Sequence, residues 1–138
     1  MNKCKITVLK TSFNADFVRE YGAKGIAPCT VLHEGQTFIA DYEMPEGFCS
    51  AAWRTIYPNV FALTHGIKGS YMKYTDWVNR EGLAIACCHD GLRPVYFKIE
   101  VIDIPSDYTV VGNEEYEITK NKQKMKEDKV SECALQND

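Results

Sequence analysis

The chain has 138 residues, of which 45% are hydrophobic and 25% charged, and it carries a net charge of −3 at pH 7. This composition excludes a disordered chain, and the length allows one domain of roughly 100–150 residues. The longest uncharged apolar runs, such as Val60–Leu63, exclude a membrane span, which needs about 18 residues. No clustered Lys/Arg face is evident, so no nucleic-acid partner is expected.

Six cysteines are the unusual feature of the composition. The first residues, 1–5, lead directly into a strand pattern without an apolar signal segment, so we expect a cytosolic protein. Its cysteines should then be mostly reduced. Cys4 is expected in the core, and Cys133 at the surface of the tail.

Two strands are predicted in the first third of the chain. Residues 3–10 alternate, with Cys4, Ile6 and Val8 on one face, which is the period of a half-buried strand. A second strand is predicted over residues 36–41.

A short helix is predicted between these strands, over residues 15–21. Asn14 is the expected N-cap, and Gly22 is expected to end the helix in the left-handed conformation. Residues 22–35 are expected to form an ordered loop.

The longest helical pattern covers residues 48–65, with Gly66 as its stop. Pro58 lies inside the pattern, so we expect a kink or two consecutive short helices. His65 is expected to cap the last carbonyls. One face carries the apolar residues that must be buried: Cys49, Trp53, Ile56, Val60 and Leu63.

Residues 83–88 and 94–103 read as two strands joined by a turn at Asp90-Gly91, which predicts an antiparallel hairpin. The expected fold is α+β: a small, mainly antiparallel sheet of about four strands with one long, Pro-kinked helix packed on one face. Residues 1–104 form the expected globular domain. Residues 105–138 form a charged extension, partly helical or disordered.

A metal site is the first chemical interpretation. Cys29 and His33 are separated by three residues in a Gly/Pro loop, and thiolate and imidazole both suit Zn²⁺. A structural site needs four ligands, and Cys49 and Cys88 lie at the ends of predicted elements. These four residues are the candidate ligands, for Zn²⁺ first and an iron–sulfur cluster second.

A reactive thiol is the second interpretation. Adjacent strand residues point to opposite faces, so Cys87 is expected in the strand core with Leu83 and Ile85, and Cys88 is presented elsewhere. Cys88 with His89 would then be the catalytic pair of a thiol-dependent redox or transfer enzyme, with Cys49 as the alternative nucleophile and His33 as the alternative base.

A small anionic substrate suits that enzyme, and Arg93 is the residue expected to orient it. The plainer interpretation pairs Arg93 with Asp90, whose simplest role is that of a turn residue. Tyr57 and Trp77 belong to an aromatic set that either walls a pocket near the end of the helix or packs in the core, the set being completed by Phe61, Tyr71 and Tyr74.

Three segments resemble a known family: 45–49 (PEGFC), 52–66 (AWRTIYPNVFALTHG) and 87–97 (CCHDGLRPVYF). The chain resembles small, uncharacterised, cysteine-containing proteins of bacteria and archaea over residues 3–103. The resemblance implies a prokaryotic cytosolic origin and a compact domain, with no established activity. It also implies that Cys29, Cys49 and Cys87 or Cys88 belong to the common design of the domain.

Three functions follow as hypotheses. The first is a metal-binding or accessory binding protein, the second is the thiol-dependent enzyme, and the third is an interaction module with inert core cysteines. The edges of a four-stranded sheet also make a homodimer plausible.

Overall fold

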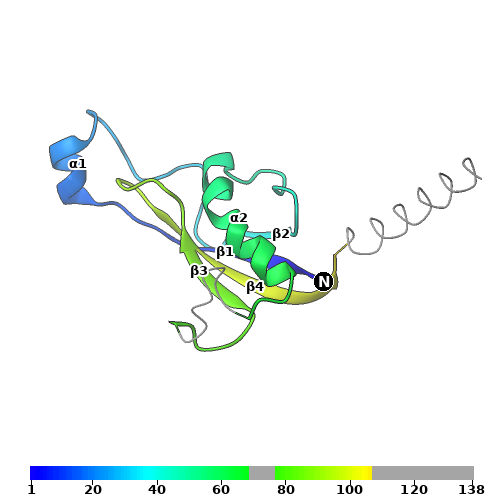
Figure 1. Cartoon of the computed structure of the whole chain (residues 1–138). Coiled ribbons are helices and arrows are strands. Elements are labelled where there is room, and N and C mark those ends of the chain that lie inside the picture. The colour runs from blue at the N-terminus through cyan, green and yellow to red at the C-terminus, as the bar shows by residue number, and fades with distance from the viewer. Residues whose placement is uncertain (69–76, 107–138) are drawn as a thin grey trace, which may run out of the picture. The chain divides into compact units, whose positions relative to one another are not determined.

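The computed structural model describes residues 1–68 and 77–106, which hold four strands and two helices (Figure 1). The predictions for Tyr71, Tyr74, Cys133 and most of the extension fall outside these residues. No helix in the described part is long and apolar enough to cross a membrane. The elements are β1 (Asn2–Thr11), α1 (Ala15–Tyr21), β2 (Thr37–Ala40), α2 (Ser50–Thr64), β3 (Leu83–Cys87) and β4 (Val95–Pro105).

The four strands form one antiparallel sheet in the order β2-β1-β4-β3. The predicted α+β class and the hairpin of β3 and β4 are confirmed. β1 and β4 are the inner strands, although they stand at opposite ends of the unit Met1–Pro105. Their pairing starts at Asn2 opposite Pro105 and reaches Thr11 opposite Val95.

The core lies between the sheet and α2, which crosses one face of it (Figure 1). The alternation of β1 buries Cys4, Ile6 and Val8, as predicted, and the matching alternation of β4 buries Phe97 and Ile99. α2 packs against the sheet through buried side chains that recur every three or four residues: Ala52, Ile56, Val60 and Leu63. Burial of this helical stripe is the main stabilising contact between the two layers.

α2 has 15 residues and is shorter than the predicted range 48–65, so the single long helix is not confirmed. Cys49 has an extended backbone (φ −76°, ψ 119°) and is the N-cap, and His65 is the C-cap. Gly66, at φ +86°, ends the helix as predicted. Pro58 lies inside one continuous helix, so the alternative of two consecutive helices is wrong.

α1 covers the predicted residues, and Asn14 is its N-cap residue, but the conformation of Gly22 and the contact of the Asn14 side chain differ from the prediction. Gly22 has φ −75° and ψ 149°, which is extended rather than left-handed. Glycine is required there because a Cβ atom would lie 2.6 Å from the Val18 carbonyl oxygen. The Asn14 side chain makes no capping hydrogen bond and instead donates through Nδ2 to the Gly91 carbonyl at 2.6 Å. None of the α1 residues is buried, and the helix extends away from the sheet (Figure 1).

Candidate functional site

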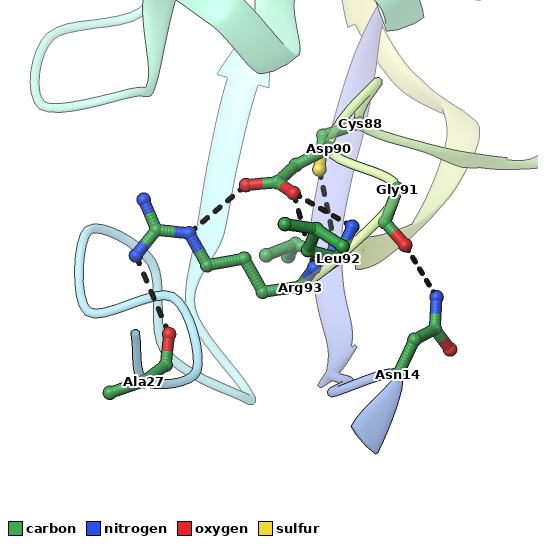
Figure 2. Close-up of polar contacts among 8 residues, drawn as sticks. Asn14, Ala27, Cys88, Asp90, Gly91, Leu92 and Arg93 are labelled. Carbon is green, nitrogen blue, oxygen red and sulfur yellow. Dashed lines mark hydrogen bonds and ion pairs between the residues drawn. The ribbon is translucent and has the colours of Figure 1, made fainter. Parts of the chain in front are cut away.

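The connection between β3 and β4 is organised by one carboxylate, that of Asp90 (Figure 2). Its Oδ1 accepts the backbone N–H groups of Leu92 at 3.0 Å and Arg93 at 3.1 Å. Its Oδ2 accepts Nε of Arg93 at 3.0 Å. The structure thus has Asp90 as the turn residue and Arg93 as its partner, the plainer of the two sequence interpretations.

The same turn holds two distant segments (Figure 2). Arg93 donates through Nη1 to the Ala27 carbonyl at 3.4 Å, and Asn14 donates to Gly91. Backbone bonds from Asn14 to Leu92 (2.9 Å) and from Ser12 to Pro94 (2.8 Å) complete the contact. The turn therefore positions the start of α1 and the loop before β2.

The electrostatics of Asp90 follow from these contacts. Burial raises the pKa of this carboxyl, but the hydrogen bonds from Arg93 and Leu92, with the Arg93 charge, outweigh burial and lower the pKa below its ordinary value. The carboxylate is ionised at neutral pH and engaged with Arg93, so Arg93 is part of the turn.

Cys88 follows β3 and packs against the core on the side of α2, together with Ala86. Its Sγ accepts the Val95 backbone N–H at 3.3 Å. His89 is exposed beside it. The core placement of Cys87 is wrong: this residue is exposed, because the register sets Ala84 and Ala86 opposite Ile99 and Phe97 on the core face.

The four candidate metal ligands are all within the described residues. Cys29, Cys49 and Cys88 are partly buried and border the same core cluster, whereas His33 is exposed. Across residues 1–68 and 77–106, no three His, Cys, Asp or Glu side chains are grouped so that they could hold a metal ion. The described residues therefore bring no three of the four candidate ligands together in one group.

Cys4 is the inert thiol that its position in the strand predicts. It is fully buried, and its Sγ lies 3.5 Å from Thr64 Oγ1 and 3.8 Å from the Val60 carbonyl oxygen of α2. Burial raises the pKa of this thiol, the Thr64 contact lowers it, and the Asp41 charge raises it. The thiol is accordingly protonated at neutral pH and enclosed between the two layers.

An apolar cavity of about 630 Å³, widely open to solvent, lies along the C-terminal half of α2. It is lined by Tyr57, Pro58, Phe61, Ala62, His65 and Ile67. A second hollow of about 530 Å³ adjoins it and shares His65 and Ile67. Tyr57 thus lines a cavity, as one interpretation predicted. Trp77 is 75% exposed and Arg93 belongs to the turn, and neither lines the cavity.

One wall of the cavity continues an aromatic row along α2, made by Trp53, Tyr57, Phe61 and His65. Successive ring centroids are 5.1, 6.0 and 4.1 Å apart. Each step spans four residues, so the rings stack along one flank of the helix. Phe61 is 43% exposed, which leaves its ring accessible from the cavity.

Tyr42 holds His65, the residue at the C-terminal end of the aromatic row. Its hydroxyl lies 3.0 Å from His65 Nε2, and His65 Nδ1 lies 2.8 Å from the Phe61 carbonyl oxygen. Because a carbonyl only accepts, Nδ1 carries a proton, and in the neutral imidazole Nε2 accepts the Tyr42 hydroxyl. The predicted capping role of His65 is confirmed, and both ring nitrogens are engaged.

The hydroxyl of Tyr57 is also perturbed. Burial raises its pKa, and Tyr42 and Asp41 raise it further, so it is a neutral hydroxyl at physiological pH. The roles of His65 and Tyr42 in this site were not predicted from the sequence. The repeat of four from Trp53 to His65 was a usable signal for His65, whereas nothing local to Tyr42 predicted its contact.

Comparison with known proteins gave no match to a family model, a curated protein or a solved structure.

Proposed function

We propose that this chain is a non-enzymatic binding domain that takes up a small molecule bearing an apolar ring in the cavity beside α2. The main support for this proposal is the cavity of about 630 Å³, which is lined by Tyr57, Phe61, Ile67 and their neighbours. Ligand sites typically measure about 300–1,000 Å³ and are lined mainly by apolar and aromatic groups with few polar ones. This cavity has both properties.

Preorganisation supports the proposal. The rings of Tyr57 and Phe61 are held in the stacked row, and His65 is held by Tyr42 and by the Phe61 carbonyl. A ligand ring entering the cavity meets side chains that are already fixed, so little side-chain entropy is lost on binding. Ring-on-ring contact with Phe61 then favours flat apolar groups.

The test is an NMR titration of isotope-labelled protein with indole, a flat apolar probe. Saturable shifts are expected at Phe61, Ala62 and Ile67. Phe61→Ala is expected to weaken indole binding about tenfold, which corresponds to about 1.4 kcal/mol.

Phe17→Ala is the matched control for this titration. It removes the same ring from α1, where Phe17 is 49% exposed and lines neither hollow. Equal losses in the two variants, or shifts that avoid the flank of α2, would overturn the proposal.

A reactive thiol at Cys88 is a second candidate, supported by the N–H of Val95 that points to its sulfur. Timed alkylation read by mass spectrometry compares Cys88 with its neighbour Cys87, which is exposed. Faster alkylation of the less exposed Cys88 supports the enzyme hypothesis with His89 as base, and slower alkylation counts against it.

Metal binding by Cys29, His33, Cys49 and Cys88 stays a prediction. Its support is that the three cysteines border one core cluster. About one zinc per chain after anaerobic purification, lost in Cys29→Ser, would support it. Protein without metal would leave the three thiols as reduced residues at the border of the core.

A further inference from the structure

β3 is an edge strand of the sheet. The backbone N–H and C=O groups of its residues point alternately toward β4 and away from the sheet. Gly82 accepts the Val101 N–H at 2.9 Å, and Cys88 donates its N–H to the Val95 carbonyl at 3.0 Å. Hydrogen-bonded pairs recur at every second residue of an antiparallel ladder, so even-numbered residues direct their backbone groups to β4. The odd-numbered residues direct theirs away from the sheet: Leu83, Ile85 and Cys87.

This edge lacks the features that protect edge strands. Its sequence, LAIAC, has no charge and no proline, and its register with β4 runs without a bulge. Ile85 is 52% exposed and Cys87 is also exposed. Within residues 1–68 and 77–106 no fifth strand pairs with this edge. An uncharged, regular edge with an exposed isoleucine at its centre is suited to pairing with another strand.

We propose that two copies of this chain pair antiparallel through β3, around a two-fold axis at Ile85. The three residues whose backbone groups point away from the sheet are symmetric about Ile85, although the Leu83 side chain is itself buried. In this register Ile85 meets Ile85 of the second copy, and Leu83 meets Cys87 of the second copy. The two-fold axis adds a third pair, Cys87 with Leu83 of the second copy. All three pairs are then hydrogen-bonded, which gives about six backbone hydrogen bonds, two per pair. The sheets of the two copies become one continuous sheet.

The side chains fit this pairing on both faces. Ile85 would pack on its counterpart on the face opposite α2, and Ala84 would face Ala86 of the second copy on the α2 side, where both are small. The strand ends are complementary as well. Glu81, whose exposed carboxylate has one oxygen 3.2 Å from Lys68 Nζ, precedes the strand, and the exposed His89 follows it. Antiparallel pairing brings the start of one strand beside the end of the other.

A second copy is the partner that these features select, because the outward groups and the ends of β3 are complementary to β3 itself. None of the side chains that line the cavity beside Tyr57 belongs to β3. The pairing is therefore independent of the proposed ligand site, and either proposal can fail without the other.

Sedimentation equilibrium of the full chain tests the pairing. The expected mass at about 100 µM is twice the 15.7 kDa of one chain. Ile85→Lys sets two like charges opposite each other and is expected to weaken dimerisation at least tenfold. Ile39→Lys is the matched control, because Ile39 is 44% exposed on the other edge strand, β2. Circular dichroism checks that both variants are folded.

Hydrogen exchange gives a second measurement. Dimerisation should slow the amide hydrogens of Leu83, Ile85 and Cys87 as the protein concentration rises. A mass of 15.7 kDa at every concentration, or a dimer that Ile39→Lys dissociates and Ile85→Lys does not, would overturn the inference. Protection of β3 that arises only with a different protein would also overturn it.

Discussion

Asp90 shows how much one side chain contributes to this fold. Its carboxylate accepts two backbone N–H groups and the Arg93 guanidinium, and the turn it closes also holds Asn14 and Ala27 (Figure 2). Hydrogen bonds to a charged group contribute about 1.5–3 kcal/mol when they are shielded from water. The Asp90 side chain is 37% exposed, so solvent screening reduces its contribution to about 1 kcal/mol.

Asp90→Ala should therefore lower the free energy of unfolding by about 1 kcal/mol at pH 7, as measured by urea unfolding. The pKa of Asp90 is depressed in the folded state, so its stabilisation is complete above the unfolded value of about 3.9. It is lost as pH falls from there through the folded-state pKa. The variant and the wild type should converge in that range.

Asp103→Ala is the control for this prediction, since Asp103 is an exposed aspartate of β4 outside the turn. It should have little effect at either pH. A difference between Asp90→Ala and the wild type that stayed constant from pH 7 to pH 3 would contradict the role of the charge.

Single residues were predictable where their chemistry is local. Asp90 and Arg93 are three residues apart, and turn preference alone suggested their pairing. The alternation of β3 correctly separated Cys87 from Cys88 but did not indicate which face is covered. That depends on the register with β4 and on the position of α2, and neither is contained in five residues of sequence.

At the scale of the element, α2 tolerates a proline in its interior. Pro58 has no N–H to donate to the Arg54 carbonyl, and interior proline disfavours a helix by about 3 kcal/mol relative to alanine. Part of this cost is offset because proline restricts the unfolded chain by about 0.4–1 kcal/mol. Its ring also lines the cavity beside Tyr57.

Pro58→Ala should consequently raise the free energy of unfolding by about 2 kcal/mol, seen as a higher midpoint in thermal unfolding. Pro45→Ala is the matched control, because Pro45 lies in the turn before α2 and its fixed φ restricts the unfolded chain. It should leave stability unchanged or lower it. A loss of stability in Pro58→Ala would mean that the cavity wall requires the ring.

The locations of the helices and strands were more predictable from the sequence than the residues at which they begin and end. The period of apolar residues located α2, β1 and β4, because burial of one face imposes that period. Caps depend on tertiary partners: Asn14 could have capped α1, but its side chain bonds to Gly91, 77 residues away. The extended backbone of Cys49 likewise starts α2 later than its pattern indicated.

At the scale of the molecule, the two layers meet at Phe97. This ring is fully buried and lies 5.5 Å from the ring of Phe48, the residue before the N-cap of α2. Phe97→Ala should lower the free energy of unfolding by about 3–5 kcal/mol, a large part of the total of about 5–15 kcal/mol for a domain. Urea unfolding measures the change.

Tyr96→Ala is the comparison for Phe97→Ala, because Tyr96 is the neighbouring residue of β4, is only partly buried and points to the face of the sheet opposite α2. Its ring lies 5.2 Å from Lys10 Nζ, an exposed contact of small value. The loss should be under about 1.5 kcal/mol. Equal losses in the two variants would mean that the core does not lie where the structure has it.

The candidate site was the least predictable feature, because it needs segments that only the fold brings together. The sequence offered cysteines and histidines with plausible spacing, yet the cavity is made by the flank of α2, with Tyr42 fixing His65 from the segment after β2. The four-residue repeat of rings was visible in the sequence. The sequence did not show whether another element would cover that flank of α2.

The pairing of β1 with β4 affects how the chain is made. β1 leaves the ribosome before β4, and this longest partner is complete only after about 95 more residues, which takes roughly 5–20 s at typical rates of synthesis. During that interval Cys4, Ile6 and Val8 have no sheet to enter, since the short β2 offers only four residues. Contacts so distant in sequence also slow folding itself. The first strand is therefore the segment that most needs shielding during translation, and a chaperone that binds nascent chains should act on it.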